Sequence, residues 1–354
     1  MMRIKRLEGY LESEGLDAFI IGRESSICYF SGSTSGGLLI VKRGIEPQLL
    51  VPKLNLELAK EQSRDCYLKP YGQKDLLELM EKILGNECKS VGVDELPLSL
   101  FNKIKEKFKD KVFRDREDIV WKMRRVKDAD EVRLLEKAGE LASIGMEAVR
   151  EHLKEGVKEN EIAAEAVYEM MRNGAQDRAF PLIIASGFRS AYPHADVTDR
   201  RLREGDLVTV DMGAVYKNYR SDITRTFVLG SPTKKQREIF ELVLNAKAIA
   251  ITKYKDGLKC SEADAAARNL IKNGGYGDYF IHSLGHGIGL DIHEPPSIGE
   301  GNSETLVTGN VVTNEPGIYV PKFGGVRIED TILVGDGDPK NLTKFDETVE
   351  DLTV

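Results

Sequence analysis

A carboxylate stands inside an apolar strand pattern in the second half of the chain. Residues 207–214 read Leu-Val-Thr-Val-Asp-Met-Gly-Ala and follow a Glu-Gly-Asp turn, which predicts a strand that carries Asp211. Burying an unpaired carboxylate is costly. The chain must therefore fold so that Asp211 meets a compensating partner, and this requirement limits the folds open to it.

Three more acidic residues stand at the edges of predicted strands. Asp222 precedes the strand pattern at 224–229, Glu315 follows an apolar run at 311–312, and Glu329 ends the run Gly-Val-Arg-Ile-Glu. Taken singly, any of the 58 acidic residues is adequately explained as a surface charge or a salt bridge. Four acids at strand edges, beside a cluster of histidines, indicate cation binding instead.

Three of the five histidines fall within one glycine-rich stretch. His282, His286 and His293 lie in His-Ser-Leu-Gly-His-Gly-Ile-Gly-Leu-Asp-Ile-His, whereas His152 and His194 stand apart. A lone histidine is adequately explained by packing in a core, but packing alone does not explain three so close together. Glycines in such a stretch permit close backbone turns that direct side chains to one point.

Four carboxylates and one imidazole form an oxygen-rich donor set. This set favours Mn²⁺ or Co²⁺, with Zn²⁺ as an alternative, over a thiolate zinc site. Four acids carry more negative charge than one divalent ion neutralises, so we expect two ions bridged by carboxylates. Such a pair generates a hydroxide near neutral pH and polarises a carbonyl group. The predicted ligands are Asp211, Asp222, His286, Glu315 and Glu329.

Length and charge narrow the class of protein. A chain of 354 residues that is 41% hydrophobic is long enough for two domains with ordinary cores. Its net charge of -7, with both signs mixed along the chain, argues against nucleic acid as the main partner, because phosphate binding needs a basic surface. We therefore expect an enzyme or a binding protein that acts on something other than nucleic acid.

The sequence contains no pattern typical of a signal peptide or a membrane span. Charges continue through Glu14, and no stretch approaches the roughly 20 apolar residues that span a bilayer. We expect a cytoplasmic protein without membrane contact. In that reducing compartment the four cysteines, which lack C-x-x-C spacing, are expected to be buried thiols.

The first third of the chain has the pattern of a small α/β unit. Short apolar runs at 18–21, 36–41 and 49–51 predict buried strands, and helical patterns at 75–83 and 98–108 alternate with them. A polar junction at 121–130 follows, where Asp128 or Asp130 is suited to cap a helix that extends to about Leu153. We expect domains at 1–125 and 126–354.

A faint internal repeat occurs in the second domain. The segment from Lys154 and the segment from Lys255 each give a glycine turn, a short cap and an amphipathic helix, and each is followed by a histidine, His194 or His293. Helix-cap chemistry can recur by chance, but turn, helix and histidine recur in the same order. We favour a duplicated half-domain, which gives a pseudo-twofold fold with its site along the axis.

Six short motifs occur in order along the second domain. They are Val-Asp-Met-Gly-Ala (210–214), Tyr-Arg-Ser-Asp-Ile-Thr-Arg-Thr-Phe (219–227), Gly-His-Gly-Ile-Gly-Leu (285–290), His-Glu-Pro-Pro (293–296), Asn-Glu-Pro-Gly-Ile-Tyr (314–319) and Gly-Val-Arg-Ile-Glu-Asp (325–330). Together they resemble the Xaa-Pro dipeptidase (prolidase) and aminopeptidase P family. The resemblance covers essentially the whole chain. It implies an N-terminal α/β domain and an α+β pita-bread catalytic domain with pseudo-twofold symmetry, as in methionine aminopeptidases and creatinase.

The resemblance implies a role for each matching residue. Asp211 chelates one metal ion, Asp222 and Glu329 bridge both ions, and Glu315 and His286 complete the second. Thr224 supports the bound carboxylates. Apart from the resemblance, we predict structural or surface roles for His282 and His152. The residues implied to act on the substrate are His194 and His293, which steady the intermediate, Arg327, which helps to position the peptide, Tyr319 near the site, and Phe180 and Ile292 in the proline pocket. A simple salt bridge for Arg327 and core packing for Tyr319 are the alternatives.

The implied reaction is hydrolysis of the peptide bond that precedes proline. A hydroxide between the metal ions attacks the carbonyl, and Glu315 relays its proton to the proline nitrogen. Rival readings are a methionine aminopeptidase-like exopeptidase and a non-catalytic peptide-binding module of the same fold. The chain is short for this family, which slightly favours a dipeptidase over an aminopeptidase P. A homodimer is implied by similarity.

Overall fold

The computed structural model describes residues 2–72 and 75–354, and the chain divides after Arg124 into two compact units. Unit 1 contains a mixed sheet in the order β4-β3-β2-β1-β5-β6, in which β1 is antiparallel to β2 and parallel to β5. Its strands are β1 (Ala18–Ile21), β2 (Leu38–Lys42), β3 (Gln48–Pro52), β4 (Tyr67–Tyr71), β5 (Ser90–Val93) and β6 (Val112–Asp115).

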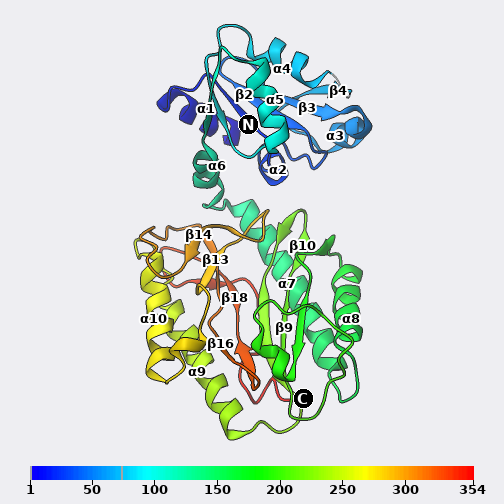
Figure 1. Ribbon diagram of the computed structural model, residues 1–354, viewed down its shortest axis with the longest axis vertical. Coiled ribbons are helices and arrows are strands. Elements are labelled where there is room, and N and C mark those ends of the chain that lie inside the picture. The colour runs from blue at the N-terminus through cyan, green and yellow to red at the C-terminus, as the bar shows by residue number, and fades with distance from the viewer. Residues whose placement is uncertain (1, 73–74) are drawn as a thin grey trace. The chain divides into compact units, whose positions relative to one another are not determined.

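Helices surround this sheet, as Figure 1 shows. The apolar runs predicted as buried strands are β1, β2 and β3, and the two predicted helices are α4 and α5. Ile20 and Ile40 belong to one buried cluster with Met80 of α4 and Ile104 of α5. Successive strand residues face opposite sides, and Phe19 is fully buried as well, so both faces of β1 are covered. The helices are α1 (Met2–Ser13), α2 (Glu24–Ser31), α3 (Leu56–Gln62), α4 (Leu76–Leu84), α5 (Leu98–Lys107) and α6 (Glu117–Arg124).

Unit 1 contains a buried carboxylate, Asp94, that is bound by backbone N–H groups. Asp94 follows β5, and its Oδ1 accepts the backbone N–H of Gly22 at 2.7 Å and of Glu95 at 2.5 Å. Its Oδ2 is buried and has no hydrogen-bond partner among the described residues. Burial raises the pKa of Asp94 to about 6, although the backbone donors lower it.

This pKa predicts that Asp94→Asn stabilises the protein at neutral pH. The folded pKa lies above the unfolded one, so the stability of the natural chain falls as pH rises from about 4 to 6. We expect the variant to be more stable by about 2 kcal/mol above this window and equal below it. Urea unfolding followed by the fluorescence of Trp121, the only tryptophan, measures the difference. A gap that does not change with pH would contradict the expectation, and the exposed Asp110→Asn is the control.

Unit 2 is built from two helix pairs and several short antiparallel sheets. Helices α7 and α8 lie together on one side of the unit, and α9 and α10 lie on the other (Figure 1). The helices are α7 (Ala129–His152), α8 (Glu159–Arg172), α9 (Lys234–Ile251) and α10 (Cys260–Asn273). Asp128 caps α7 by accepting the N–H groups of Asp130 and Glu131, as one of the two predicted caps.

The strands of unit 2 repeat one arrangement in its two halves. The first half has the order β12-β9-β8, and the second contains β18-β15-β13, with antiparallel pairing throughout both. An isolated antiparallel bridge between Thr224 and Glu329 joins β12 to the residue before β18. The strands are β7 (Asp177–Arg178), β8 (Ile183–Ser186), β9 (Leu207–Met212), β10 (Ala214–Tyr216), β11 (Tyr219–Arg220), β12 (Ile223–Val228), β13 (Gly285–Gly287), β14 (Glu294–Ile298), β15 (Val311–Asn314), β16 (Gly317–Val320), β17 (Gly324–Arg327), β18 (Asp330–Leu333) and β19 (Lys340–Asn341).

The repeated sequence segments adopt the same turn in each half. Gly156 and Gly257 have φ angles of +85° and +82°, a left-handed conformation that favours glycine. Their N–H groups donate to Leu202 and to Leu306, both at 2.9 Å. The recurrence in sequence therefore corresponds to matched structure.

The helix that follows each turn begins in the same way. The backbone N–H of Lys158 donates to Glu161, and that of Lys259 donates to Glu262, so each helix carries half of a capping box. Helices α8 and α10 then have equal lengths of 14 residues. The predicted pseudo-twofold α+β architecture is confirmed.

One core runs through both halves of unit 2. Val210 of β9, Phe240 of α9 and Ile332 of β18 are fully buried members of the same cluster. Burying side chains from both halves together makes the duplicated unit one cooperative body. Among the residues that the structure describes, none of the helices is both long and apolar enough to cross a bilayer.

Candidate metal centre

The five predicted ligands come from five different parts of unit 2 and line one cavity of about 490 Å³. Asp211 lies in β9, Asp222 directly precedes β12, and His286 is the middle residue of β13. Glu315 follows β15, and Glu329 directly precedes β18. Because β9 pairs with β12 and β15 with β18, the two symmetric sheets each bring two carboxylates to their shared edge.

Three of the five ligands meet closely enough to hold one ion. One ligand atom each from Asp222, His286 and Glu329 lies within 4.8 Å of the others. The Nε2 atom of His286 lies 3.6 Å from Asp222 Oδ2 and 3.4 Å from Glu315 Oε1. These separations suit donor atoms that surround a common cation rather than bond to one another.

Several carboxylate oxygens in the cluster lack hydrogen-bond partners. Among the described residues, Asp211 Oδ1, Asp222 Oδ1 and Glu329 Oε1 are buried and accept no hydrogen bond. Buried polar atoms in folded proteins are nearly always paired, and an exception needs an explanation. Carboxylate oxygens left free inside a cavity are the donors that a divalent cation takes. The residues present therefore fit a bound metal.

The electrostatics of the cluster agree with this fit. Burial raises the pKa of Asp222 and of Glu329 well above their usual values, and the neighbouring carboxylates raise them further. Burial also raises the pKa of Glu315 to about 8. Close carboxylates cannot all stay ionised without positive charge. A cation supplies that charge, so metal binding and loss of protons are coupled here.

Two residues outside the ligand set organise the carboxylates. The hydroxyl group of Thr224 donates to Glu329 Oε2 at 2.6 Å, and it accepts Arg327 Nε at 3.1 Å. Arg327 also donates to Asp211 Oδ2 at 2.6 Å. Glu329 and Asp211 are each left with one bonded and one free oxygen, so Thr224 and Arg327 fix where those two free oxygens lie.

His286 is oriented by backbone and side-chain contacts. Its Nδ1 lies 2.9 Å from the carbonyl oxygen of Gly287, which assigns the proton to Nδ1 and leaves Nε2 free to accept a cation. Burial lowers the pKa of His286 to about 4, so the ring is neutral at neutral pH. Thr313 accepts the His286 N–H and donates to Glu315, which links two predicted ligands.

The predicted substrate residues surround the same cavity, with one difference. His194 and His293 are exposed side chains on its wall, and Phe180 and Ile292 line it. The ring of His293 stacks edge-on against His286 at 4.4 Å between centroids. Tyr319 is 3% exposed, and its hydroxyl group is held by Arg327 at 2.8 Å, so it contacts the cavity wall from behind. Arg327 both lines the cavity and forms an ion pair, so the salt bridge weighed as its alternative is present.

Comparison with known proteins gives the family. The model of metallopeptidase family M24 matches residues 133–336, more than half of the chain. The chain belongs to metallopeptidase family M24. The Creatinase/Prolidase N-terminal domain matches residues 3–126, which form the α/β unit. The resemblance stated from the sequence motifs is confirmed.

Relatives of this M24 chain match it along nearly its whole length. The Xaa-Pro dipeptidase of Pyrococcus furiosus is 43% identical over 97% of each chain. The crystal structure of a prolidase from Pyrococcus horikoshii has a TM-score of 0.94 at 41% identity and covers 99% of this chain and 100% of that one. An X-Pro aminopeptidase from Thermotoga maritima has a TM-score of 0.92 at 34% identity, with 99% of each chain covered. The predicted fold class is confirmed.

One residue of this M24 cavity was given only a structural or surface role from the sequence. His282 lines the cavity, and its Nε2 lies 2.9 Å from the Tyr319 hydroxyl oxygen. Burial lowers the pKa of His282 to about 4, and the nearby Arg327 charge lowers it further. Its place in the glycine-rich stretch was the available signal. Sequence spacing does not show which histidines of such a stretch face the cavity.

Proposed function

We propose that this M24 chain is an Xaa-Pro dipeptidase that hydrolyses the bond preceding proline with the help of two divalent metal ions. The observation that carries the proposal is the group of buried carboxylates with free oxygens, which meets a neutral histidine in one cavity. The names of relatives that match over nearly the whole chain support the substrate class.

The metal ions would be held by Asp211, Asp222, His286, Glu315 and Glu329. Oxygen donors with a single imidazole favour Mn²⁺ or Co²⁺, and Zn²⁺ is the alternative. When bound, such ions supply an activated water molecule and polarise the carbonyl group of the substrate.

The remaining cavity residues act on the peptide in this proposal. Glu315 lies in the cavity, where its Oε1 is 3.4 Å from His286 Nε2, and a carboxylate at this place can exchange a proton with the reacting groups. It takes a proton from the attacking water and passes it to the proline nitrogen. His194 and His293 face the cavity from opposite halves and donate to the developing oxyanion. Arg327 orients Asp211 and the peptide.

Specificity for proline follows from the shape and chemistry of the wall. A proline nitrogen in a peptide bond carries no N–H and cannot donate a hydrogen bond, so a site that prefers proline at this position must recognise the ring. Phe180 and Ile292 give the cavity an apolar side that fits a pyrrolidine ring. A homodimer remains part of the proposal on the strength of the resemblance, and a cytoplasmic location remains the expectation drawn from the sequence pattern.

A panel of three peptides tests the proposed specificity. We expect Mn²⁺-dependent hydrolysis of Ala-Pro to exceed that of Ala-Pro-Ala, and we expect Met-Ala to be cleaved least. A chelator should abolish each activity, and Mn²⁺ or Co²⁺ should restore it. Preferred cleavage of Ala-Pro-Ala would indicate an aminopeptidase P instead, and preferred cleavage of Met-Ala would indicate a methionine aminopeptidase. Absence of any cleavage in a chain that binds metal would indicate a binding module.

A further inference from the structure

The two cavity histidines are supported by the backbone in different ways. His293 directly precedes β14, whose first residue, Glu294, pairs with Gly287 of β13, so a strand ladder fixes its position. His194 lies between the short helix η2 (Gly187–Ala191) and an isolated bridge at Arg201, and no described strand includes it. Irregular backbone of this kind needs other contacts to hold one conformation.

Those contacts converge on one buried carboxylate outside the cavity. Glu159, the first residue of α8, is fully buried and accepts five hydrogen bonds. Its Oε1 accepts the N–H and the hydroxyl group of Ser186 at 2.9 and 2.7 Å. Its Oε2 accepts the N–H and the hydroxyl group of Thr198 at 3.0 and 2.6 Å, and it also pairs with Arg189. The donors stand on both sides of His194 in the sequence, so Glu159 closes the segment into a loop.

Arg189 extends the support to the cavity wall. One of its guanidinium nitrogens bonds Glu159, and another donates to the carbonyl oxygen of Asp196 at 2.6 Å. Asp196 and His194 both line the cavity. A continuous path of hydrogen bonds therefore runs from the buried carboxylate to the backbone two residues beyond His194.

The charge on Glu159 is maintained by these donors. Burial alone would raise the pKa of Glu159, but the donors from Thr198, Ser186 and Arg189 outweigh burial and lower it. A carboxylate that is buried, ionised and fully bonded is strongly tied to its partners, because loss of one donor leaves charge unsatisfied.

A comparison of the two halves of unit 2 shows that the hydrogen bonds of the Glu159 side chain are not part of ordinary helix capping. Glu159 and Cys260 begin the two matched helices, and their N–H groups make matched bonds, to Arg200 at 3.1 Å and to Glu304 at 2.9 Å. The backbone frame is therefore the same in both halves. Only the first half places a carboxylate there, and only the first half carries its histidine on an unpaired loop. In the second half the matching position at the start of the helix is occupied by the buried thiol of Cys260.

We propose that Glu159 is a positioning residue for His194, and that it fixes the 187–198 loop so that this histidine meets the bound peptide. The inference rests on the proposed function, in which His194 contacts the substrate. Glu159 is not among the residues that line the cavity or form the metal-binding group, so it acts on the peptide only through the segments that it bonds, the loop and the end of β8.

A double-mutant cycle tests the inference with Ala-Pro as substrate. Glu159→Gln keeps the size of the side chain, but it replaces one of the two accepting oxygens with an N–H₂ group that faces hydrogen-bond donors. We expect it to lower kcat/KM by about tenfold to a hundredfold, because a misplacement of about 1 Å costs that much. In a His194→Ala background the same change should alter kcat/KM less than about twofold, because the residue it positions is gone. Equal losses in both backgrounds would overturn the proposal.

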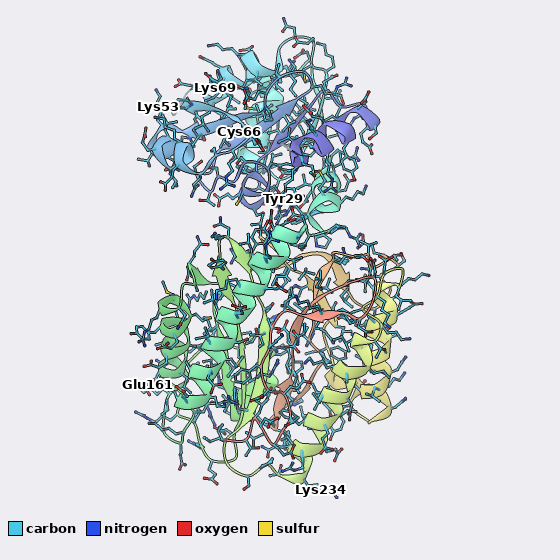
Figure 2. All side chains as sticks on the ribbon, turned by 180° about the vertical axis from the view of Figure 1, so that it is seen from behind. Tyr29, Lys53, Cys66, Lys69, Glu161 and Lys234 are labelled. Carbon is cyan, nitrogen blue, oxygen red and sulfur yellow. The ribbon has the colours of Figure 1, made fainter. Side chains whose placement is uncertain are left out.

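Glu161→Gln is the matched control, because the same substitution falls on the same helix. Glu161 is exposed on α8 (Figure 2), and its side chain accepts the N–H of Lys158, so its substitution should leave activity unchanged. Mn²⁺ binding measured by calorimetry should be unaltered in both variants, and weaker binding in Glu159→Gln would also overturn the proposal. If Glu159→Gln does not fold, Thr198→Val removes one donor and should show the same background dependence.

Hydrogen exchange separates failure of the inference from failure of the proposed function. Amides of residues 187–198 should exchange faster in Glu159→Gln than in Glu161→Gln or the natural chain. The exchange measurement does not depend on whether the protein is active. An inactive natural chain would overturn the proposed function, whereas unchanged exchange in this segment would overturn the positioning role of Glu159.

Discussion

Asp222→Ala is expected to abolish metal-dependent hydrolysis of Ala-Pro. Asp222 is one of three residues whose donor atoms lie within 4.8 Å of each other, and one of its oxygens is free among the described residues. Loss of this ligand removes several kcal/mol of transition-state stabilisation by the metal, which corresponds to a loss of about a thousandfold or more in kcat/KM.

Stability measurements distinguish this loss from unfolding. Burial and the neighbouring carboxylates disfavour the ionised form of Asp222 in the metal-free chain, so Asp222→Ala should fold at least as stably as the natural chain without metal. Adding Mn²⁺ should raise the Tm of the natural chain, and it should raise the Tm of Asp222→Ala by much less. The control is Asp338→Ala, since the Asp338 side chain is 98% exposed. Activity near that of the natural chain would reject the assignment of Asp222.

The second large effect concerns stability. Asp330→Ala should cost about 3–5 kcal/mol of unfolding free energy, because it removes one partner of a buried charge network. Asp330 pairs with Arg225 at 2.9 Å and with Lys247, and these two side chains are 0% and 7% exposed. Arg225 also donates to the carbonyl oxygens of Thr224 and Glu329, at 2.9 and 2.6 Å. The network therefore lies directly behind Thr224 and the predicted metal ligand Glu329.

Thermal unfolding followed by far-ultraviolet circular dichroism measures this cost. Glu140→Ala removes half of the exposed Lys137 pair, and exposed pairs contribute roughly 1 kcal/mol or less, so it serves as the control. We also expect weaker Mn²⁺ binding in Asp330→Ala, because Arg225 loses the partner that holds it against Glu329. A cost no larger than that of the control would show that the network does not stabilise unit 2.

Residue patterns alone gave several elements of the fold correctly. The apolar runs of β1, β2 and β3 are short and continuous because both faces of the sheet are covered, and burial on both faces removes polar residues from the sequence. The recurring glycine turn and cap also predicted the two halves, since positive φ angles and capping leave local signatures. Features that depend on a few neighbouring residues can therefore be predicted from the sequence.

Contacts between distant residues could not be predicted from the sequence. Sequence spacing did not show that His282 lines the cavity, or that the hydroxyl group of Tyr319 lies behind the wall and contacts both Arg327 and His282. Nothing local marks Glu159 as a buried acceptor of five hydrogen bonds, since its donors come from residues 186–198. A carboxylate at a helix start predicts an exposed charge unless distant donors are known.

The sequence by itself determined which chemistry this chain carries. Acids at strand edges and a glycine-rich histidine stretch are explained by cation binding, because an unpaired buried charge is too costly to occur without a partner. The tertiary structure decided which of these side chains meet and which residues hold them in place. The bridge between Thr224 and Glu329 joins the sheet of β9 and β12 to that of β15 and β18, so carboxylates from the two halves of the unit meet, and only the folded backbone defines that meeting.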